Sequence, residues 1–279
     1  MDSQTSSAAA GTFRWPVTRQ RLARDLRRLG VTKGQTLLVH ASLRSLGRVK
    51  GGAPTVVAAL RDALGPGGHA VAPTGTEDNS QSSRVHRARI ETMTPDQVRE
   101  FRLGMPAFDR ETTPSGMGAI SEALRTAPGA ARSAHPQSSF AAIGPEADLL
   151  MGEHPLESHL GPGSPLGRLH KMDAQVLMIG VGYWAFTGFH LAEYLYTPEP
   201  PLRKYACVVA GTDGRPGWRE YDDVVLDDQK FEVIGESLEK KVPVRRGRVG
   251  HADCRLVSLY DAVEHAREWM AENRRITLA

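Results

Sequence analysis

Hydrophobic positions in the first quarter of the chain switch between helical and strand-like spacing. Between Thr18 and Gly30 the apolar residues recur three and four positions apart, which predicts an amphipathic helix with Thr18 as its N-cap. The almost continuous apolar run 35–43 (QTLLVHASL) predicts a strand that is buried on both faces. A helix over 54–64 and a short strand over 69–73 are expected next. A strand, a helix and a strand in this order are typical of an α/β protein.

The same alternation continues through the middle of the chain. A helix is expected over 114–125, and a strand over 139–144. The run 175–182 (QVLMIGVG) predicts another buried strand, and 187–196 (TGFHLAEYLY) predicts the helix that follows it. The stretch 74–94, in contrast, is polar and shows no periodicity, which is typical of a long functional or mobile loop.

The pattern of the C-terminal third predicts a β-hairpin followed by helices. Strands are expected near 205–210 and 218–225, joined through an Asp-Gly turn at 213–214. Helices are expected over 227–240 and 258–273. The whole pattern predicts an α/β fold in which helices flank a mixed sheet core, with a β-hairpin-rich C-terminal third.

Composition and charge exclude several classes of protein. The 35 basic and 32 acidic side chains give a net charge of +3, which is too balanced for a nucleic-acid coat. No run of about 18 apolar residues is present, so no membrane span is expected. The Ser/Ala-rich segment 1–14 lacks the pattern of a signal peptide, and we expect a flexible tail followed by a single domain over 15–279 in a cytoplasmic protein. Cys207 and Cys254 lack metal or disulfide spacing and are expected to be buried thiols.

His190 and Glu193 are the first candidates for chemistry, because they directly follow the buried strand 175–182. Residues three apart share a helix face, and ligands of open α/β sheets gather at the carboxyl ends of the strands. A histidine beside a carboxylate is suited to general-base catalysis. The spacing is also compatible with a surface pair that has no role, or with a metal site. A metal site would need further carboxylates, and since we find none, no metal is expected.

Glycine- and serine-rich turns form a second set of candidates. The segments 40–52 and 115–118 combine free backbone amides with hydroxyls, and Lys50 adds an ammonium group, as a phosphate-binding turn would. Arg132, close to His135, is another candidate for an anion. For each segment taken singly, ordinary capping and turn chemistry is the favoured explanation. Neither a P-loop nor a nucleophile elbow occurs. The remaining histidines share no spacing and are expected at the surface or in structural positions: His86, His154, His159, His170, His251 and His265.

The order of these motifs resembles that of the aminoglycoside 3-N-acetyltransferase family. The similarity is collinear from about Thr18 to Trp269. It is carried by the segments 37–43 (LLVHASL), Gly51-Gly52, Pro73-Thr74, 114–118 (PSGMG) with Glu122 and Arg125, 132–136 (RSAHP), 161–166 (GPGSPL) and 187–194 (TGFHLAEY).

The resemblance implies acetyl-CoA as the acetyl donor, an amine of an aminoglycoside antibiotic as the acceptor, and no metal. It implies an α/β architecture distinct from that of the GNAT acetyltransferases. His190 matches the catalytic histidine of the family, Glu193 its supporting carboxylate, and His40 a second active-site histidine. The positions that the resemblance places around CoA are Ser42, Leu43, Lys50, Gly51, Thr74, Ser115, Met117, Gly118, Arg132 and Ser138.

The implied reaction is acetylation of the 3-amino group of the 2-deoxystreptamine ring, which gives antibiotic resistance. His190 would free the lone pair of the amine for direct attack on the thioester, without an acyl-enzyme. A polycationic acceptor needs carboxylates, and those expected to contact it are Glu77, Asp78 and Glu193, with the hydroxyl of Thr187 nearby. A second acidic group is formed by Asp222, Asp223, Asp227 and Asp228.

One departure from the family pattern concerns the acceptor. Many relatives resemble Gly-His-Asp-x-Asn-Thr before the catalytic helix, whereas here Gly182 is followed by Tyr-Trp-Ala-Phe at 183–186. The change removes polar groups beside the expected acceptor pocket. Two alternatives therefore stay open: an acetyltransferase of the same fold acting on another amine, such as a biosynthetic intermediate, and a non-catalytic CoA-binding module. A monomer and a homodimer are equally compatible with the sequence.

Overall fold

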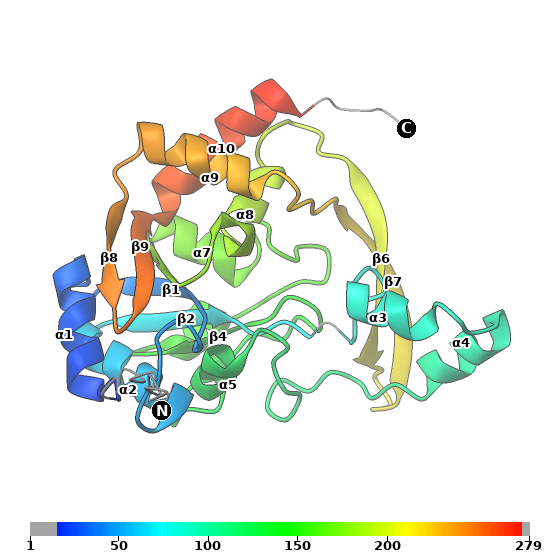
Figure 1. Cartoon of the computed structure of the whole chain (residues 1–279). Helices are drawn as coiled ribbons and strands as arrows, with labels where there is room; N and C mark the ends of the chain where they lie inside the picture. Colours follow the sequence, from blue (N-terminus) through cyan, green and yellow to red (C-terminus); the bar gives the residue numbers. More distant parts are fainter. Residues whose placement is uncertain (1–15, 77, 275–279) are drawn as a thin grey trace, which may run out of the picture.

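The computed structural model describes residues 16–76 and 78–274, and nine strands lie within them. The strands are β1 (Thr36–Ala41), β2 (His69–Pro73), β3 (Ala131–Arg132), β4 (Phe140–Ile143), β5 (Gln175–Ile179), β6 (Leu202–Ala210), β7 (Pro216–Val224), β8 (Arg245–Val249) and β9 (Ala252–Ser258). Seven of them form a mixed sheet in the order β3-β4-β2-β1-β5-β9-β8, and β6 pairs with β7 in a separate hairpin (Figure 1). The three central strands β2, β1 and β5 are parallel.

Helices cover both faces of this sheet. They are α1 (Arg19–Leu29), α2 (Gly52–Leu64), α3 (Arg84–Ile90), α4 (Pro95–Leu103), α5 (Ala119–Arg125), α6 (Ala147–Met151), α7 (Pro165–Lys171), the 3₁₀ helix η1 (Tyr183–Ala185), α8 (Phe189–Glu193), α9 (Phe231–Lys241) and α10 (Leu259–Asn273). Side chains of α1, α2 and α5 share one buried hydrophobic cluster with the sheet, and those of α6 to α10 share another on the opposite face. The result is a three-layer α/β/α arrangement (Figure 1).

Successive side chains of β1 point to opposite faces of the sheet. Leu37 and Val39 belong to the cluster under α1 and α2, whereas Leu38 belongs to the cluster under α8. His40 follows the alternation and lies on the α8 side, opposite Met178 of β5. Because β1 and β5 are parallel, their carboxyl ends meet at one edge of the sheet. This edge carries the connection from β5 to α8.

The β6–β7 hairpin is separate from the main sheet and bonds both to residues 79–81, which follow β2, and to Gln137 and His159. Asn79 is buried, and its side-chain amide donates to the carbonyl oxygen of Val208 (2.8 Å) and accepts from the amide of Val208 (2.6 Å). α3 and α4 lie along the hairpin, on the side of the molecule away from α1 (Figure 1). Part of the segment after β2 therefore packs on the hairpin rather than on the main sheet.

The α/β class, the mixed sheet flanked by helices and the C-terminal hairpin are confirmed. The expectation of an aperiodic loop over 74–94 is wrong for Arg84–Ile90, a short helix that buries only His86. The predicted helix over 114–125 begins at Ala119, because Gly118 has a φ of +94° and caps it. The predicted helix over 187–196 is α-helical only from Phe189 to Glu193.

β8 and β9 were not predicted as strands. β8 is mostly exposed at the sheet edge and reads as a basic segment rather than as an alternating strand. Both cysteines are free and buried, as expected. The proposed tail 1–14 lies outside the described residues. Across the described parts of the chain, no helix is both long and apolar enough to cross a membrane.

Candidate active site

The pair predicted from spacing is formed. His190 donates a hydrogen bond from Nδ1 to Oε2 of Glu193 (2.7 Å), because the two side chains lie one turn apart on α8. The Glu193 side chain is fully buried, whereas the His190 side chain keeps 17% of its surface exposed. The His190 ring packs on Phe231, with 4.6 Å between ring centroids. Since Nδ1 carries the proton, the Nε2 lone pair is the basic atom of this histidine.

Glu193 is held by two further donors that come from distant parts of the chain. Its Oε1 accepts from the backbone amide of Asp227 (2.9 Å) and from Nη1 of Arg274 (2.7 Å). Arg274 is not among the residues predicted from the sequence to lie at this site. It lies 81 positions from Glu193, and no local spacing signals such a contact.

His40 lies close to the carboxyl end of β1 and is buried. Its ring stacks on Phe186 with 6.3 Å between centroids, and Phe186 in turn stacks on Phe189 at 4.3 Å. No described residue bonds to Nε2 of His40. Burial lowers the pKa of His40 to about 4, so the ring is neutral at pH 7. An aromatic layer therefore runs from His40 to the helix that carries His190.

Three further histidines form a buried cluster beside the hairpin. The ring of His135 lies 4.7 Å from that of His154 and 4.4 Å from that of His159. His159 bonds through Nε2 to the hydroxyl of Tyr221 (2.5 Å). Burial lowers the pKa of all three histidines, to about 4 for His154 and about 3 for His159. His154 and His159 therefore occupy structural positions, one of the two environments expected for them.

Asp223 links this cluster to α8. Its Oδ2 accepts from the His159 amide and from the Tyr194 hydroxyl, both at 2.8 Å. Burial raises the pKa of Asp223. The carboxylate is thus engaged inside the fold, whereas Asp222 is exposed and pairs with Lys204.

The predicted CoA residues fall into separate groups. Ser42 and Leu43 follow β1, where the Ser42 amide donates to the carbonyl of Ile179 (2.9 Å). Lys50 and Gly51 are exposed, and Gly51 caps α2 with a φ of +86°.

A second group of these residues is internally bonded. Arg132 is buried and donates from Nη2 to the carbonyl of Thr74 (2.6 Å) and from Nε to the hydroxyl of Ser139 (3.0 Å). The Ser138 hydroxyl bonds to the carbonyl of His159 (3.0 Å). In the turn before α5, the Ser115 hydroxyl accepts from the Met117 amide (3.1 Å). Their contact with CoA stays a prediction.

Ser115 and Asp78 line one cavity of about 1010 Å³ between α3, α4 and the segment 104–116. Asp78 is exposed and pairs with Arg89 at 3.4 Å. Most of the cavity wall is apolar, formed by Val85, Met93, Phe101, Met105, Pro106, Ala107, Phe108 and Pro114. Glu77, the neighbouring acceptor candidate, lies outside the described residues.

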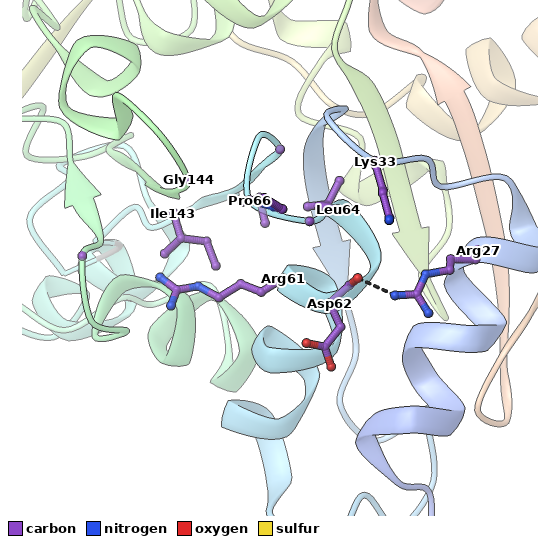
Figure 2. A pocket seen from close by; sticks show the side chains of 12 residues that line it. Arg27, Lys33, Arg61, Asp62, Leu64, Pro66, Ile143 and Gly144 are labelled. Carbon is purple, nitrogen blue, oxygen red and sulfur yellow. Dashed lines mark hydrogen bonds between the residues drawn. The ribbon is translucent and has the colours of Figure 1, made fainter.

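A second cavity, of about 670 Å³, lies at the amino ends of β1 and β2 (Figure 2). Arg27, Lys33 and Arg61 make it basic, and Arg27 donates to the carbonyl oxygen of Asp62. None of the predicted site residues lines this cavity. It lies at the edge of the sheet opposite to His40 and α8.

The four residues that depart from the family pattern enter different environments. Tyr183 is buried and its hydroxyl donates to Glu239 (3.0 Å), while Phe186 is buried under His40. Trp184 is 64% exposed, and its amide donates to Glu232 (2.8 Å). Thr187 follows directly, and its carbonyl accepts from the His190 amide (3.1 Å). The departure therefore adds one exposed indole just before α8.

In the described ranges, no three histidine, cysteine or acidic side chains are grouped so that they could hold a metal ion.

The fold is an α/β protein in which a histidine held by a buried carboxylate lies at the carboxyl edge of the central parallel strands of a mixed sheet. The family model described as aminoglycoside 3-N-acetyltransferase matches residues 38–271. The chain belongs to the aminoglycoside 3-N-acetyltransferase family and is an acyltransferase.

Two curated relatives are similar over nearly their whole length. The SPbeta prophage-derived aminoglycoside N(3')-acetyltransferase-like protein YokD of Bacillus subtilis (strain 168) is 36% identical over 261 residues, which cover 93% of this chain and 94% of YokD. Aminoglycoside N(3)-acetyltransferase VII of Streptomyces paromomycinus is 36% identical over 274 residues, covering 92% of each chain.

Solved structures agree with this assignment. The crystal structure of YokD from Bacillus subtilis superposes with a TM-score of 0.86 at 35% identity, covering 93% of this chain and 95% of YokD. AAC-VIa bound to sisomicin has a TM-score of 0.79 at 32% identity, covering 92% of this chain and 98% of that one. AAC-IIIb in a binary complex with CoASH has a TM-score of 0.79 at 30% identity, covering 92% and 97%.

Proposed function

We propose that this acyltransferase transfers the acetyl group of acetyl-CoA to the 3-amino group of the 2-deoxystreptamine ring of an aminoglycoside, and that it gives antibiotic resistance. The observation that carries the proposal is the His190–Glu193 bond, which leaves Nε2 as the basic atom of a partly exposed ring. Relatives with this name, and similar structures that hold CoASH or sisomicin, support the donor and the acceptor.

The proposed reaction begins with the removal of a proton from the acceptor ammonium. Nε2 of His190 takes this proton, and the Glu193 carboxylate stabilises the imidazolium that forms. The freed lone pair attacks the thioester carbonyl carbon directly, and a C–N bond forms as the carbonyl π electrons move to oxygen. Collapse of this intermediate breaks the C–S bond, and the sulfur leaves as a thiolate that takes up the proton held by His190. The extra proton on the amide nitrogen is released to water, and His190 is again neutral.

The oxyanion of the intermediate needs donors. The amide of Ser42 is bonded to Ile179, so the Thr187 hydroxyl, one turn before His190, is our candidate. His40 is assigned to the site as a second, neutral histidine.

For the donor, we assign the phosphates of CoA to Lys50 and Gly51. The ammonium of Lys50 is exposed, and no described residue pairs with it. Gly51 lies at the N-terminus of α2, where backbone amides favour an anion. The other residues that we assign to the CoA site are Ser42, Leu43, Thr74, Ser115, Met117, Gly118, Arg132 and Ser138.

The test is to mix the protein with acetyl-CoA and gentamicin, paromomycin or kanamycin and to follow free thiol. We expect H190A to lower kcat by about 10²–10⁴-fold, because it removes the general base. H170A, which changes a histidine on α7, is the matched control and should keep wild-type kcat. Near wild-type turnover by H190A would show that His190 is not the base.

A second acceptor class is favoured by one specific observation. The wall of the cavity lined by Asp78 is mainly apolar, and the Asp78 carboxylate is paired with Arg89. An amine with fewer positive charges would therefore fit this cavity better than a polycation. Thiol release with such an amine, but with no aminoglycoside, would select this function. A melting temperature raised by acetyl-CoA without acetylation of any amine would select a non-catalytic CoA-binding module.

A further inference from the structure

The Glu193 carboxylate is buried completely, yet donors from three separate parts of the chain reach it. His190 lies on the same helix, Asp227 precedes α9, and Arg274 follows α10. A buried carboxylate is stable only when opposite charge or hydrogen bonds compensate its lost hydration. Arg274 supplies the positive charge, and its own side chain is only 16% exposed.

Arg274, Glu193 and Asp227 form a closed ring of hydrogen bonds. Nη1 donates to Oε1 of Glu193 and Nη2 donates to the carbonyl oxygen of Asp227, both at 2.7 Å. The amide of Asp227 donates to the same Oε1 (2.9 Å). With Oε1 held from two directions, the carboxylate plane is fixed and Oε2 faces Nδ1 of His190. A planar guanidinium can bridge the two acceptors in this way, whereas an ammonium group is a single point.

We infer that Arg274 is a positioning residue for the reaction: it fixes the orientation of Glu193 and, through Glu193, the imidazole of His190. This inference rests on the proposed function, because it concerns how the general base is oriented. Arg274 has no bond to His190 itself in the described structure and acts through the carboxylate. Its loss affects the rate of the chemical step rather than the binding of either substrate.

The first experiment compares R274A and R274K with R267A, the matched control on α10, where Arg267 forms a partly exposed pair with Glu264. We expect R274A to lower kcat by about 10- to 100-fold, because a small misplacement of a catalytic group has a large effect on rate. KM for acetyl-CoA and for the acceptor should change by less than about threefold. R274K should recover part of kcat, and added guanidinium should recover part of it in R274A.

The second experiment places R274A in an E193Q background. If Arg274 acts through Glu193, R274A lowers kcat much less in E193Q than in the wild type, since the two residues are coupled. Equal losses in both backgrounds would overturn the inference, and so would wild-type kcat in R274A and R274K. If R274A does not fold, the comparison is made with R274K, which retains the positive charge. A fall in kcat for H190A together with unchanged kcat for R274A and R274K would leave the proposed function intact and reject only the role of Arg274.

Discussion

Arg132 shows at the scale of one residue how this fold buries a cation. The residue is 7% exposed, and its guanidinium donates to the carbonyls of Thr74 and Thr113 and to the hydroxyl of Ser139. Burial lowers the pKa of Arg132 to about 10, so the group stays charged at neutral pH. The carbonyls that surround it come from segments far apart in sequence. Arg132 therefore joins β3 to the end of β2 and to the loop before α5.

We expect R132K to destabilise the protein by about 3 kcal/mol, because a single ammonium cannot reach all of these acceptors and leaves buried carbonyls unpaired. Urea unfolding measures the change. R110K, which alters an exposed arginine nearby, is the control and should lie within about 0.5 kcal/mol of the wild type. Equal stability of R132K and R110K would show that the buried bonds of Arg132 contribute little.

At the scale of elements, α9 packs directly against η1, the 3₁₀ helix that precedes α8. A Cβ atom placed on Gly235 would lie 1.9 Å from Cγ of Tyr183. The Tyr183 side chain cannot retreat easily, because it is buried and its hydroxyl is bonded to Glu239 on α9. Gly235 is therefore required by the close approach of two elements, although glycine disfavours a helix by itself.

G235A should accordingly destabilise the protein, by about 1–3 kcal/mol, through overpacking. Helix propensity alone predicts the opposite sign, a gain of about 1 kcal/mol. Thermal unfolding of G235A decides between the two, with E236A on the exposed face of α9 as the control. A higher melting temperature for G235A than for the wild type would contradict the close packing described above.

Local sequence patterns predicted the strands that are buried on both faces. They did not predict strands that form only because another segment pairs with them. β1 and β5 are buried on both faces, so their apolar runs identified them. β8 is basic and exposed, and it becomes a strand only because β9 pairs with it. The site follows the same rule. The His190–Glu193 pair was predictable because it is local, whereas the contact between Glu193 and Arg274 depends on how α10 docks.

At the scale of the whole molecule, burial lowers the pKa of six buried histidines in the described residues, and in four of them the shift is large. Burial lowers the pKa of His40 and His154 to about 4 and that of His159 to about 3, and it lowers the pKa of His135 well below its usual range. In the unfolded chain each would titrate near pH 6.5. Between about pH 6.5 and pH 3 the unfolded state therefore binds more protons than the native state, and acid favours unfolding.

The contribution of these histidines to the free energy of unfolding should be largest above pH 6.5 and should fall as the pH decreases. At pH 4 the loss is about 3 kcal/mol for His40 and about 3 kcal/mol for His154. Melting temperatures measured from pH 7 to pH 4 test this. H154N removes one of the titrating groups and should show a shallower decline than the wild type. Parallel curves for the two proteins would contradict a contribution from His154.

The ring of hydrogen bonds around Glu193 is completed only when distant parts of the chain have folded together. α8 alone can bring His190 next to Glu193, but the second oxygen of the carboxylate is satisfied only by residues 34 and 81 positions further along the chain. Contacts of long sequence separation form late, since closing a long loop has an entropic cost. A chain that has formed its helices but not docked α10 would hold a histidine and a carboxylate without a fixed base. The complete set of contacts around Glu193 therefore requires the docked C-terminal end of α10 and the segment before α9, in addition to α8 itself.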